Sequence, residues 1–474
     1  MNAGLNNHSA WHGGRPTDGY VVAGKNKPMP QALTREVGLL RAIAGQLEQR
    51  PLPFEQVTQE FLRKEGLGHV REKAGNIISL GISAHQAFGD LTDCLRDRYP
   101  AMERGSTYAD VQTELFSFIE AYVGREPSTI ATSDAEALLT RFEHWFAQRA
   151  SSRRVFVPCL ITRTAAPRFE IGPVTFEFIN RIRTSDFWPS LKGEASLDRH
   201  GFEDLLKWMH EGDAYWLARV SVDGCEQRRA EEIAELAVDL AIVALQLSAP
   251  ALGTSTMARL DARRGTSQKR TLSEAGGYHN AGWTRKEPGL TIGRGTLEDI
   301  LLKSAQLIAA VGNLVQSFAS GSFRLPTLER AWCDAAYWLH QARAESIDTI
   351  AIAKLETALE VLFCSESARG SEQRILGIFH AFFGLAPDAP INPGSLISAR
   401  QFARRIVRDR SRILHGTWST LNARGLDRAG IEGFVISVVR MAAVELDAYA
   451  HSPDPSDDID EFLHWMKKRR GALA

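Results

Sequence analysis

The chain lacks the features of secreted, membrane-spanning and metal-binding proteins. No window approaches 18 uncharged apolar residues, since the most apolar stretch, 234–247, contains Glu235 and Asp239. The N-terminus has no apolar core of a signal peptide. The cysteines form no C-x-x-C pair and stand far apart, at Cys94, Cys159, Cys225, Cys333 and Cys364. We therefore expect reduced thiols, no disulfide framework and no metal, in a cytoplasmic protein that does not span a membrane.

An excess of charge is also missing. The 56 lysines and arginines balance 57 acidic residues, for a formal net charge of -1, which excludes a globally basic nucleic-acid binder and leaves only a local basic surface. Arginine outnumbers lysine, which suits phosphate contacts, although a GC-rich genome explains the bias equally well. The segment 289–295 contains G-R-G but neither a Walker lysine nor a full G-x-G-x-x-G. We therefore expect no cofactor.

At 474 residues the chain is too long for a single hydrophobic core. Shifts in composition and periodicity divide it into five parts, and the predicted fold class is mainly α with a small β-containing middle domain, that is, α+β. The parts are a disordered tail at 1–30, a helical region at 31–150, an α+β domain at 151–325 that is a candidate for sensing or regulation, a helical bundle at 326–452, and a tail helix at 453–474.

The middle part carries the β signal. Strands are predicted at 155–161, at 169–178 with a break at Gly172–Pro173, and at 215–222, followed by an apolar helix at 229–247. Between Ala258 and Lys286 the periodicity is lost and basic residues collect. We interpret this segment as a solvated surface loop, with a mobile basic loop that guides a polynucleotide as the alternative.

The C-terminal third consists of apolar stripes at helical spacing with short connections, which predict an antiparallel bundle. One helix ends in R-D-R-S-R-I-L-H-G, residues 408–416. Arginine and histidine in a last turn complement the helix dipole, and glycine is the usual stop, so this stretch is also consistent with an ordinary helix end. The Arg410–His415 spacing occurs once, where the composition predicts about 1.2 chance occurrences. Spacing alone therefore carries no function.

The context of the motif is more specific. The runs A-W-C-D-A-A-Y-W-L-H-Q-A (331–342), A-I-A-K-L-E-T-A-L-E-V-L-F (351–363), R-I-L-G-I-F and R-S-R-I-L-H-G follow one another. In this order they resemble the HEPN domain of the Apea-like group, and R-F-E-I-G-P-V-T-F is similar to the region that often precedes such domains. The resemblance covers the last third of the chain well and the middle third loosely.

The resemblance implies a bundle that dimerises and brings two motifs to one cleft. Many members are metal-independent endoribonucleases of antiviral defence or toxin systems, whereas others bind nucleotides or only assemble. Arg410 and His415 match the invariant pair, and Ser411 stands where Asn, Asp or His is common. From its place on the second helix of the bundle, Glu360 is a candidate for orienting Arg410, with a structural role, in capping or in pairing with a surface arginine, as the alternative. The implied partners are RNA and a second copy of the chain; no trigger or antitoxin is indicated.

The chemistry of the motif agrees with this implication. Cleaving RNA without a metal needs a base for the 2′-hydroxyl, a cation for the phosphorane and an acid for the 5′-oxygen. A histidine can serve as base or acid, but one histidine cannot readily do both at once, so the mechanism requires two protomers. The expected products are a 2′,3′-cyclic phosphate and a 5′-hydroxyl.

Helical geometry gives a different partner for His415. At about 100° per residue, Arg410 and His415 lie roughly 140° apart, whereas Arg408, Arg412 and His415 share one face. Geometry thus selects Arg412 and the resemblance selects Arg410; we predict Arg410. The remaining arginines are predicted to hold flanking phosphates, with a solvated face as the alternative; they are Arg404, Arg405, Arg408 and Arg412.

Overall fold

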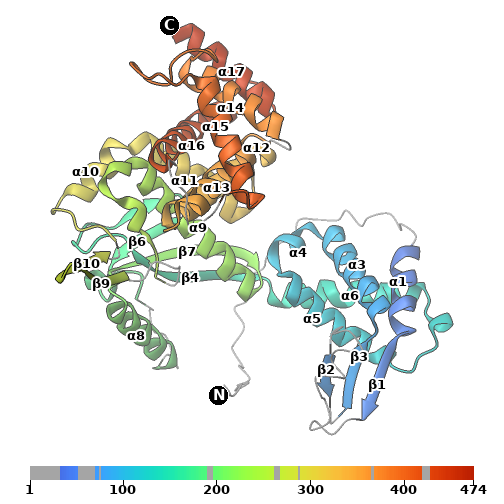
Figure 1. Ribbon diagram of the computed structural model, residues 1–474. Helices are drawn as coiled ribbons and strands as arrows, with labels where there is room; N and C mark the ends of the chain where they lie inside the picture. The colour runs from blue at the N-terminus through green and yellow to red at the C-terminus, as the bar shows by residue number, and fades with distance from the viewer. Residues whose placement is uncertain are drawn as a thin grey trace. The chain divides into compact units, whose positions relative to one another are not determined.

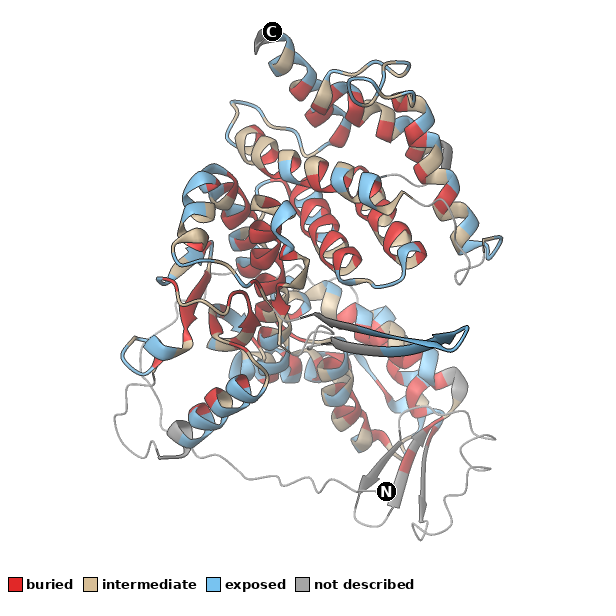
Figure 2. Cartoon of the chain, turned by 60° about the vertical axis from the view of Figure 1, so that its left-hand side comes forward, coloured by how far each residue is buried: buried red, intermediate tan, exposed pale blue. Residues whose placement is uncertain are grey.

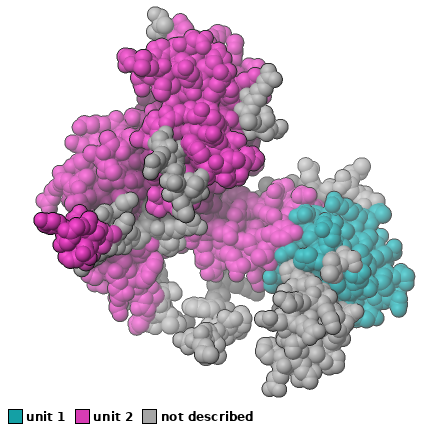
Figure 3. Space-filling model, in the orientation of Figure 1, with its two compact units in different colours: residues 1–95, 112–142 teal, residues 96–111, 143–474 magenta. Residues whose placement is uncertain are grey.

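The computed structural model describes residues 33–51, 70–73, 76–188, 196–260, 267–286, 289–364, 368–418 and 427–473. The predicted disordered tail, 1–30, lies outside the described residues. The chain divides into two compact units, residues 1–95 with 112–142 and residues 96–111 with 143–474 (Figure 3). The middle part and the C-terminal bundle belong to the same unit.

The N-terminal region is not purely helical, so the prediction for 31–150 was wrong in part. Between helices α1 (Thr34–Ala44) and α3 (Ile82–Arg98) lies a three-stranded antiparallel sheet of β1 (Leu47–Pro51), β2 (Val70–Lys73) and β3 (Asn76–Leu80), in the order β1-β3-β2. Leu47 follows Ile43 at helical spacing, but α1 stops at Ala44, and Leu47 pairs instead with Leu80, where both are buried. The helices α4 (Pro100–Gly105), α5 (Tyr108–Ile119) and α6 (Thr132–Arg149) follow.

The second unit contains a five-stranded antiparallel sheet in the order β5-β6-β7-β4-β8. The three predicted strand segments are confirmed as β4 (Ser151–Leu160), β5 (Phe169–Ile171) with β6 (Val174–Phe178), and β7 (Trp216–Cys225); β8 (Ala258–Arg259) adds a short edge. Helix α9 (Gln227–Ser248) covers one face and α8 (Ser196–Glu211) the other (Figure 1). Successive side chains of β7 point to opposite faces of the sheet. Trp216 and Ala218 therefore pack with α9, while Leu217 packs with α8.

The predicted loop at 258–286 is a β-hairpin over most of its length. Strands β9 (Ser267–Ala275) and β10 (Tyr278–Lys286) pair in regular antiparallel register. Gly276 and Gly277 connect them with φ angles of 59° and 82°, the paired positive values of a type I′ turn. The adjacent residues Gly276 and Gly277 indicate a hairpin turn, whereas the many charged residues around them favour a loop. Arg263 and Arg264 lie outside the described residues.

The rest of the unit is helical. Helices α10 (Thr296–Lys303) and α11 (Ala305–Ser320) lead to α12 (Pro326–Ala344), α13 (Asp348–Leu362), α14 (Ala368–Phe383), α15 (Ala399–Leu414), α16 (Arg428–Ala450) and α17 (Ile459–Leu473). One apolar core extends from the α9 face of the sheet through these helices, and buried residues line their facing sides (Figure 2). The predicted tail helix is part of this core, because α17 buries Phe462, Leu463 and Met466 against it.

Among the described residues, no single helix has the length and apolar character to cross a membrane. The pair α10 and α11 passes that test together, with a bend of 78° between them. In the structure, Leu307, Val311 and Leu314 of α11 are buried in the protein core.

Candidate functional site

The motif helix α15 presents two different sides. It begins with a capping box in which Ser398 and Gln401 bond each other's backbone N–H groups. One side, with Phe402, Ala403 and Ile406, is buried, and α15 packs on α13 and α14. The other side is exposed and basic, with Arg404, Arg408, Arg412 and His415. Arg410 lies toward the buried side, so the two predicted catalytic residues leave the helix in different directions.

Arg410 is held by two glutamates of α13. Its Nη1 donates to Glu360 Oε1 at 2.9 Å, and its Nη2 lies 2.7 Å from Glu360 Oε2. Its Nε lies 2.8 Å from Glu356 Oε2, a close contact whose geometry falls short of a hydrogen bond. The Ser371 hydroxyl donates to Glu360 Oε1 at 2.9 Å. The contact expected between Glu360 and Arg410 is therefore present, as one hydrogen bond and a second close approach of nitrogen to oxygen.

Glu356 is the member of this cluster that the sequence analysis missed. Its side chain is 1% exposed, and both carboxylate oxygens lack a hydrogen-bond donor. Burial raises the pKa of Glu356 to about 8, Arg410 opposes that rise, and the neighbouring charge of Glu360 adds to it. Near neutral pH, which is below this value, the Glu356 carboxyl is therefore mainly protonated. In the sequence, Glu356 precedes Glu360 by four residues, which places both on one face of a helix and indicates that both can reach Arg410.

His415 stands where the helix ends. The last α-helical residue is Leu414, His415 is the C-cap with φ -82° and ψ 4°, and Gly416 has φ 65°. The backbone N–H of Trp418 and the hydroxyl of Thr417 both bond Arg412 O, at 3.1 Å and 3.2 Å. The His415 side chain is exposed. The helix stop expected from glycine is thus observed, and it places the histidine in solvent.

The flanking arginines are partly engaged by acidic side chains. Arg404 Nε donates to Glu372 at 2.9 Å, while Arg405 and Arg408 both approach Asp409, at 3.7 Å and 3.3 Å. Asp409 is 1% exposed, and its carboxylate therefore holds the guanidinium groups of Arg405 and Arg408. The sequence analysis did not select this residue. The guanidinium of Arg412 lies over the Trp418 ring, 5.4 Å from its centre.

An open groove of about 890 Å³ runs along the same side of α15. Three of the predicted phosphate-binding residues, Arg404, Arg405 and Arg408, line it together with Ser411. Apolar side chains complete the wall, among them Leu396, which is 99% exposed. The structure therefore gathers most of the predicted basic residues in one groove, which Arg410 does not line.

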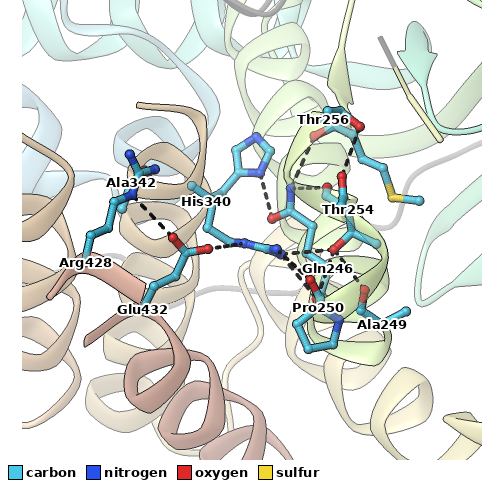
Figure 4. Close-up of polar contacts among 12 residues, drawn as sticks. Gln246, Ala249, Pro250, Thr254, Thr256, His340, Ala342, Arg428 and Glu432 are labelled. Carbon is cyan, nitrogen blue, oxygen red and sulfur yellow. Dashed lines mark hydrogen bonds and ion pairs between the residues drawn. The ribbon is translucent and has the colours of Figure 1, made fainter. Parts of the chain in front are cut away.

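A second polar cluster lies inside the unit, between α9, α12 and α16 (Figure 4). Arg343 donates from Nε to Glu432 at 3.0 Å and from Nη1 to Thr254 Oγ1 at 3.1 Å and Gln246 O at 3.3 Å. His340 Nδ1 and Gln246 Oε1 lie 3.2 Å apart. Burial lowers the pKa of Arg343, and Glu432 opposes that effect. This cluster connects α9, which packs on the sheet, with α12 and α16 of the bundle.

The fold and the site define a mainly helical α+β protein whose C-terminal bundle carries a buried arginine–glutamate cluster beside a basic groove. No protein-family model, curated protein or solved structure matches the chain. In the described part of the chain, no group of three or more His, Cys, Asp or Glu side chains is arranged to hold a metal ion.

The pKa of Glu356 predicts a pH-dependent stability. Its folded pKa of about 8 is higher than its ordinary value of 4.5, so between these values the folded state keeps a proton that the unfolded state has lost, and stability falls as pH rises. At about 1.4 kcal/mol per pKa unit, this carboxyl lowers the free energy of unfolding by up to about 5 kcal/mol across that window. Urea denaturation at about pH 5 and about pH 8 should show a smaller decline for Glu356→Gln than for the unchanged protein.

The matched control for this measurement is Glu372→Gln, since Glu372 lies on the neighbouring helix in a more exposed ion pair with Arg404. It should retain the full decline with pH. An equal decline in the Glu356→Gln protein would contradict the protonation assigned to Glu356.

Proposed function

We propose that the chain is a metal-independent HEPN endoribonuclease, which acts in bacterial antiviral defence or in a toxin-type system. The observation that carries the proposal is the fixed guanidinium of Arg410, held on Glu356 and Glu360, in the same helix end as the exposed imidazole of His415. The reaction forms a bond from the RNA 2′-oxygen to phosphorus and breaks the bond to the 5′-oxygen. It yields a 2′,3′-cyclic phosphate and a 5′-hydroxyl.

In this proposal Arg410 stabilises the charge that develops on the phosphorane. An arginine carries five N–H donors in a planar fork, and the glutamates fix the orientation of the fork before substrate arrives. The second N–H on each Nη atom has no partner in the described part of the chain. Because Glu360 occupies the edge between the two Nη atoms, these two N–H groups point in diverging directions, and each offers a phosphate oxygen a single hydrogen bond. The side chain is 28% exposed, so substrate has access to it.

His415 takes the proton of the 2′-hydroxyl or delivers one to the 5′-oxygen. Because both transfers accompany one displacement, two histidines are needed, and the second comes from a partner protomer that docks through the bundle. The same arrangement brings a His415 to the side of α15 that its own protomer's His415 does not face. Arg410 and His415 of one protomer lie roughly 140° apart around the helix and cannot act together. In the dimer, Arg410 of one protomer can act with His415 of the other.

The groove beside α15 extends the site for RNA. Arg404, Arg405 and Arg408 line it with Ser411 and contact successive phosphates. Each phosphate contact releases counterions and makes binding dependent on salt. Residues 31–325 sense a trigger or restrain the nuclease in this scheme, and the protein acts in the cytoplasm.

One observation favours a second candidate, a non-catalytic HEPN module that binds RNA or nucleotide or scaffolds a complex. Arg410 is already held by the side chains of Glu356 and Glu360 and lies on the other side of α15 from His415. The exposed side keeps Arg404, Arg408 and Arg412, a surface sufficient for binding phosphates.

The two candidates differ in the fate of RNA. We expect the purified protein to cleave single-stranded RNA or total tRNA in EDTA, to leave cyclic-phosphate ends, and to lose this activity in His415→Ala, which also excludes a contaminating nuclease. Binding without cleavage would establish the module instead. A monomer at about micromolar concentration with neither activity would overturn both and leave 408–416 as a helix end.

A further inference from the structure

Strand β4 has a largely unpaired edge. It pairs with β7 along nearly all of its length but with β8 only at Cys159 and Leu160. On the β8 side, the Leu260 N–H donates to Pro158 O at 2.9 Å, and no other described strand continues along this edge. Proline lacks an N–H and is confined to sheet edges and bulges, so Pro158 is consistent with this position.

The Pro158 bond fixes which backbone groups face outward. In an antiparallel strand the N–H and C=O of one residue point to the same side, and the side alternates from residue to residue. Because Pro158 O points away from β7, the N–H and C=O groups of Phe156 and Arg154 do so as well. In the described part of the chain none of these four groups has a hydrogen-bond partner. Such a row recognises another extended backbone.

A groove of about 690 Å³ follows this edge along seven consecutive residues, Ser152 to Pro158. Its walls come from the two helices that cover opposite faces of the sheet (Figure 1): Trp208 of α8, which is 46% exposed, and Gln227, Glu231 and Glu235 of α9. A groove closed on both faces admits one extended strand. The edge of a second folded sheet would bring its own covering helices against these walls.

The side chains of the groove specify the occupant. Phe156 packs with the α8 cluster and Val157 with the α9 core, so a paired strand presents alternate residues to the two walls. Toward α8 it meets Phe156 and the exposed Trp208, which favour apolar side chains, with the exposed Arg154 at one end. Toward α9 the guanidinium of Arg153 bonds the carbonyls of Arg149 and Cys225, and Glu235 pairs with Arg259 at 2.8 Å, so the exposed Glu231 is the charge left for the occupant. That wall favours lysine or arginine.

We propose that this groove binds one extended segment of a partner protein, added to β4 as a further strand, in which apolar and basic residues alternate. The backbone groups of Arg154 and Phe156 supply the hydrogen bonds, and the two walls supply the sequence preference. This mode of recognition is strand addition. It does not depend on the nuclease activity proposed above.

The test uses a fluorescent peptide of about eight residues in which valine and lysine alternate, and a control peptide with the same residues in two blocks. Anisotropy should show binding of the alternating peptide and at least about tenfold weaker binding of the block peptide. Arg154→Pro removes an outward N–H and no bond to β7, so it should weaken binding at least about tenfold relative to Arg154→Ala. Glu231→Lys should also weaken binding.

Equal binding of the two peptides, equal binding by the proline and alanine variants, or no binding up to about 1 mM peptide would overturn the proposal. If Arg154→Pro does not fold, N-methylation of the alternating peptide at the residues that face β4 makes the same test on the unchanged protein. Undiminished binding of that peptide would likewise overturn it.

Discussion

Arg410→Ala is expected to slow RNA cleavage by about 100- to 1,000-fold, the usual effect of removing one pre-oriented donor from a charged transition state. Arg412→Ala should slow it by less than about tenfold, because that side chain is exposed and lies over Trp418 and in the proposed mechanism contacts only flanking phosphates. Initial rates on an end-labelled single-stranded RNA in EDTA compare the two variants directly. Loss confined to Arg412→Ala would reverse the assignment and make the exposed side of α15 the catalytic one.

A loss of folding must be separated from a loss of chemistry in this comparison. Arg410→Ala leaves Glu360 without its cation and Glu356 without its only close polar contact in the described part of the chain, which destabilises the bundle. Arg410→Lys keeps the charge but not the planar fork of donors. This variant should therefore fold like the unchanged protein but cleave RNA more slowly than it. The double variant Arg410→Ala, Glu356→Gln removes the buried acid as well and should recover stability without recovering activity. Recovery of activity in the double variant would show that Arg410 acts only on stability.

Local patterns were sufficient for most of the elements in the second unit. The alternation on either side of Gly172–Pro173 predicts the hairpin of β5 and β6 because both the period and the turn are written in neighbouring residues. The apolar stretch that became α9 was equally clear, since a helix buried between a sheet and other helices is apolar on nearly all sides. What the sequence does not reveal is the close approach of Gly172 to the backbone of Gly312, 140 positions later.

The sheet of β1, β2 and β3 and the hairpin of β9 and β10 were missed for opposite reasons. Leu47 continues a helical spacing that a strand overrides, which is a tertiary effect. In the hairpin, an adjacent glycine pair was available and was given less weight than the charge around it.

The candidate site was predictable only along one helix. The angle between Arg410 and His415 around the helix follows from their residue numbers alone. In the structure Arg410 is half-buried and His415 is exposed. The partner of Arg410 on another helix was proposed at Glu360 but not at Glu356. A buried, protonated glutamate is invisible to patterns that treat every acidic residue as a surface charge. The polar cluster around Arg343 was missed for the same reason.

That cluster gives the largest expected change in stability. Removing one partner of a buried ion pair costs about 3–5 kcal/mol, because the other is left unpaired. Arg343→Ala should therefore lower the free energy of unfolding by about that amount in urea denaturation followed by circular dichroism. The side chain of Arg343 is 3% exposed, and its loss removes the bonds to Gln246 O and Thr254 Oγ1 and leaves Glu432 with only the longer ion pair to Arg428, at 3.5 Å. Arg330→Ala, on the exposed side of the same helix, should cost about 1 kcal/mol or less.

Two further variants identify the origin of the cost. Arg343→Met fills the volume without the charge, so a recovery of most of the loss would assign the effect to packing. If the cost persists in Arg343→Met and falls when Glu432→Gln is added, the carboxylate of Glu432, left with Arg428 alone, is responsible. Because Arg343 bonds both the α9 end and α16, hydrogen exchange should accelerate in both helices together. Acceleration confined to one helix would mean that the cluster stabilises that helix alone and does not join the sheet to the bundle.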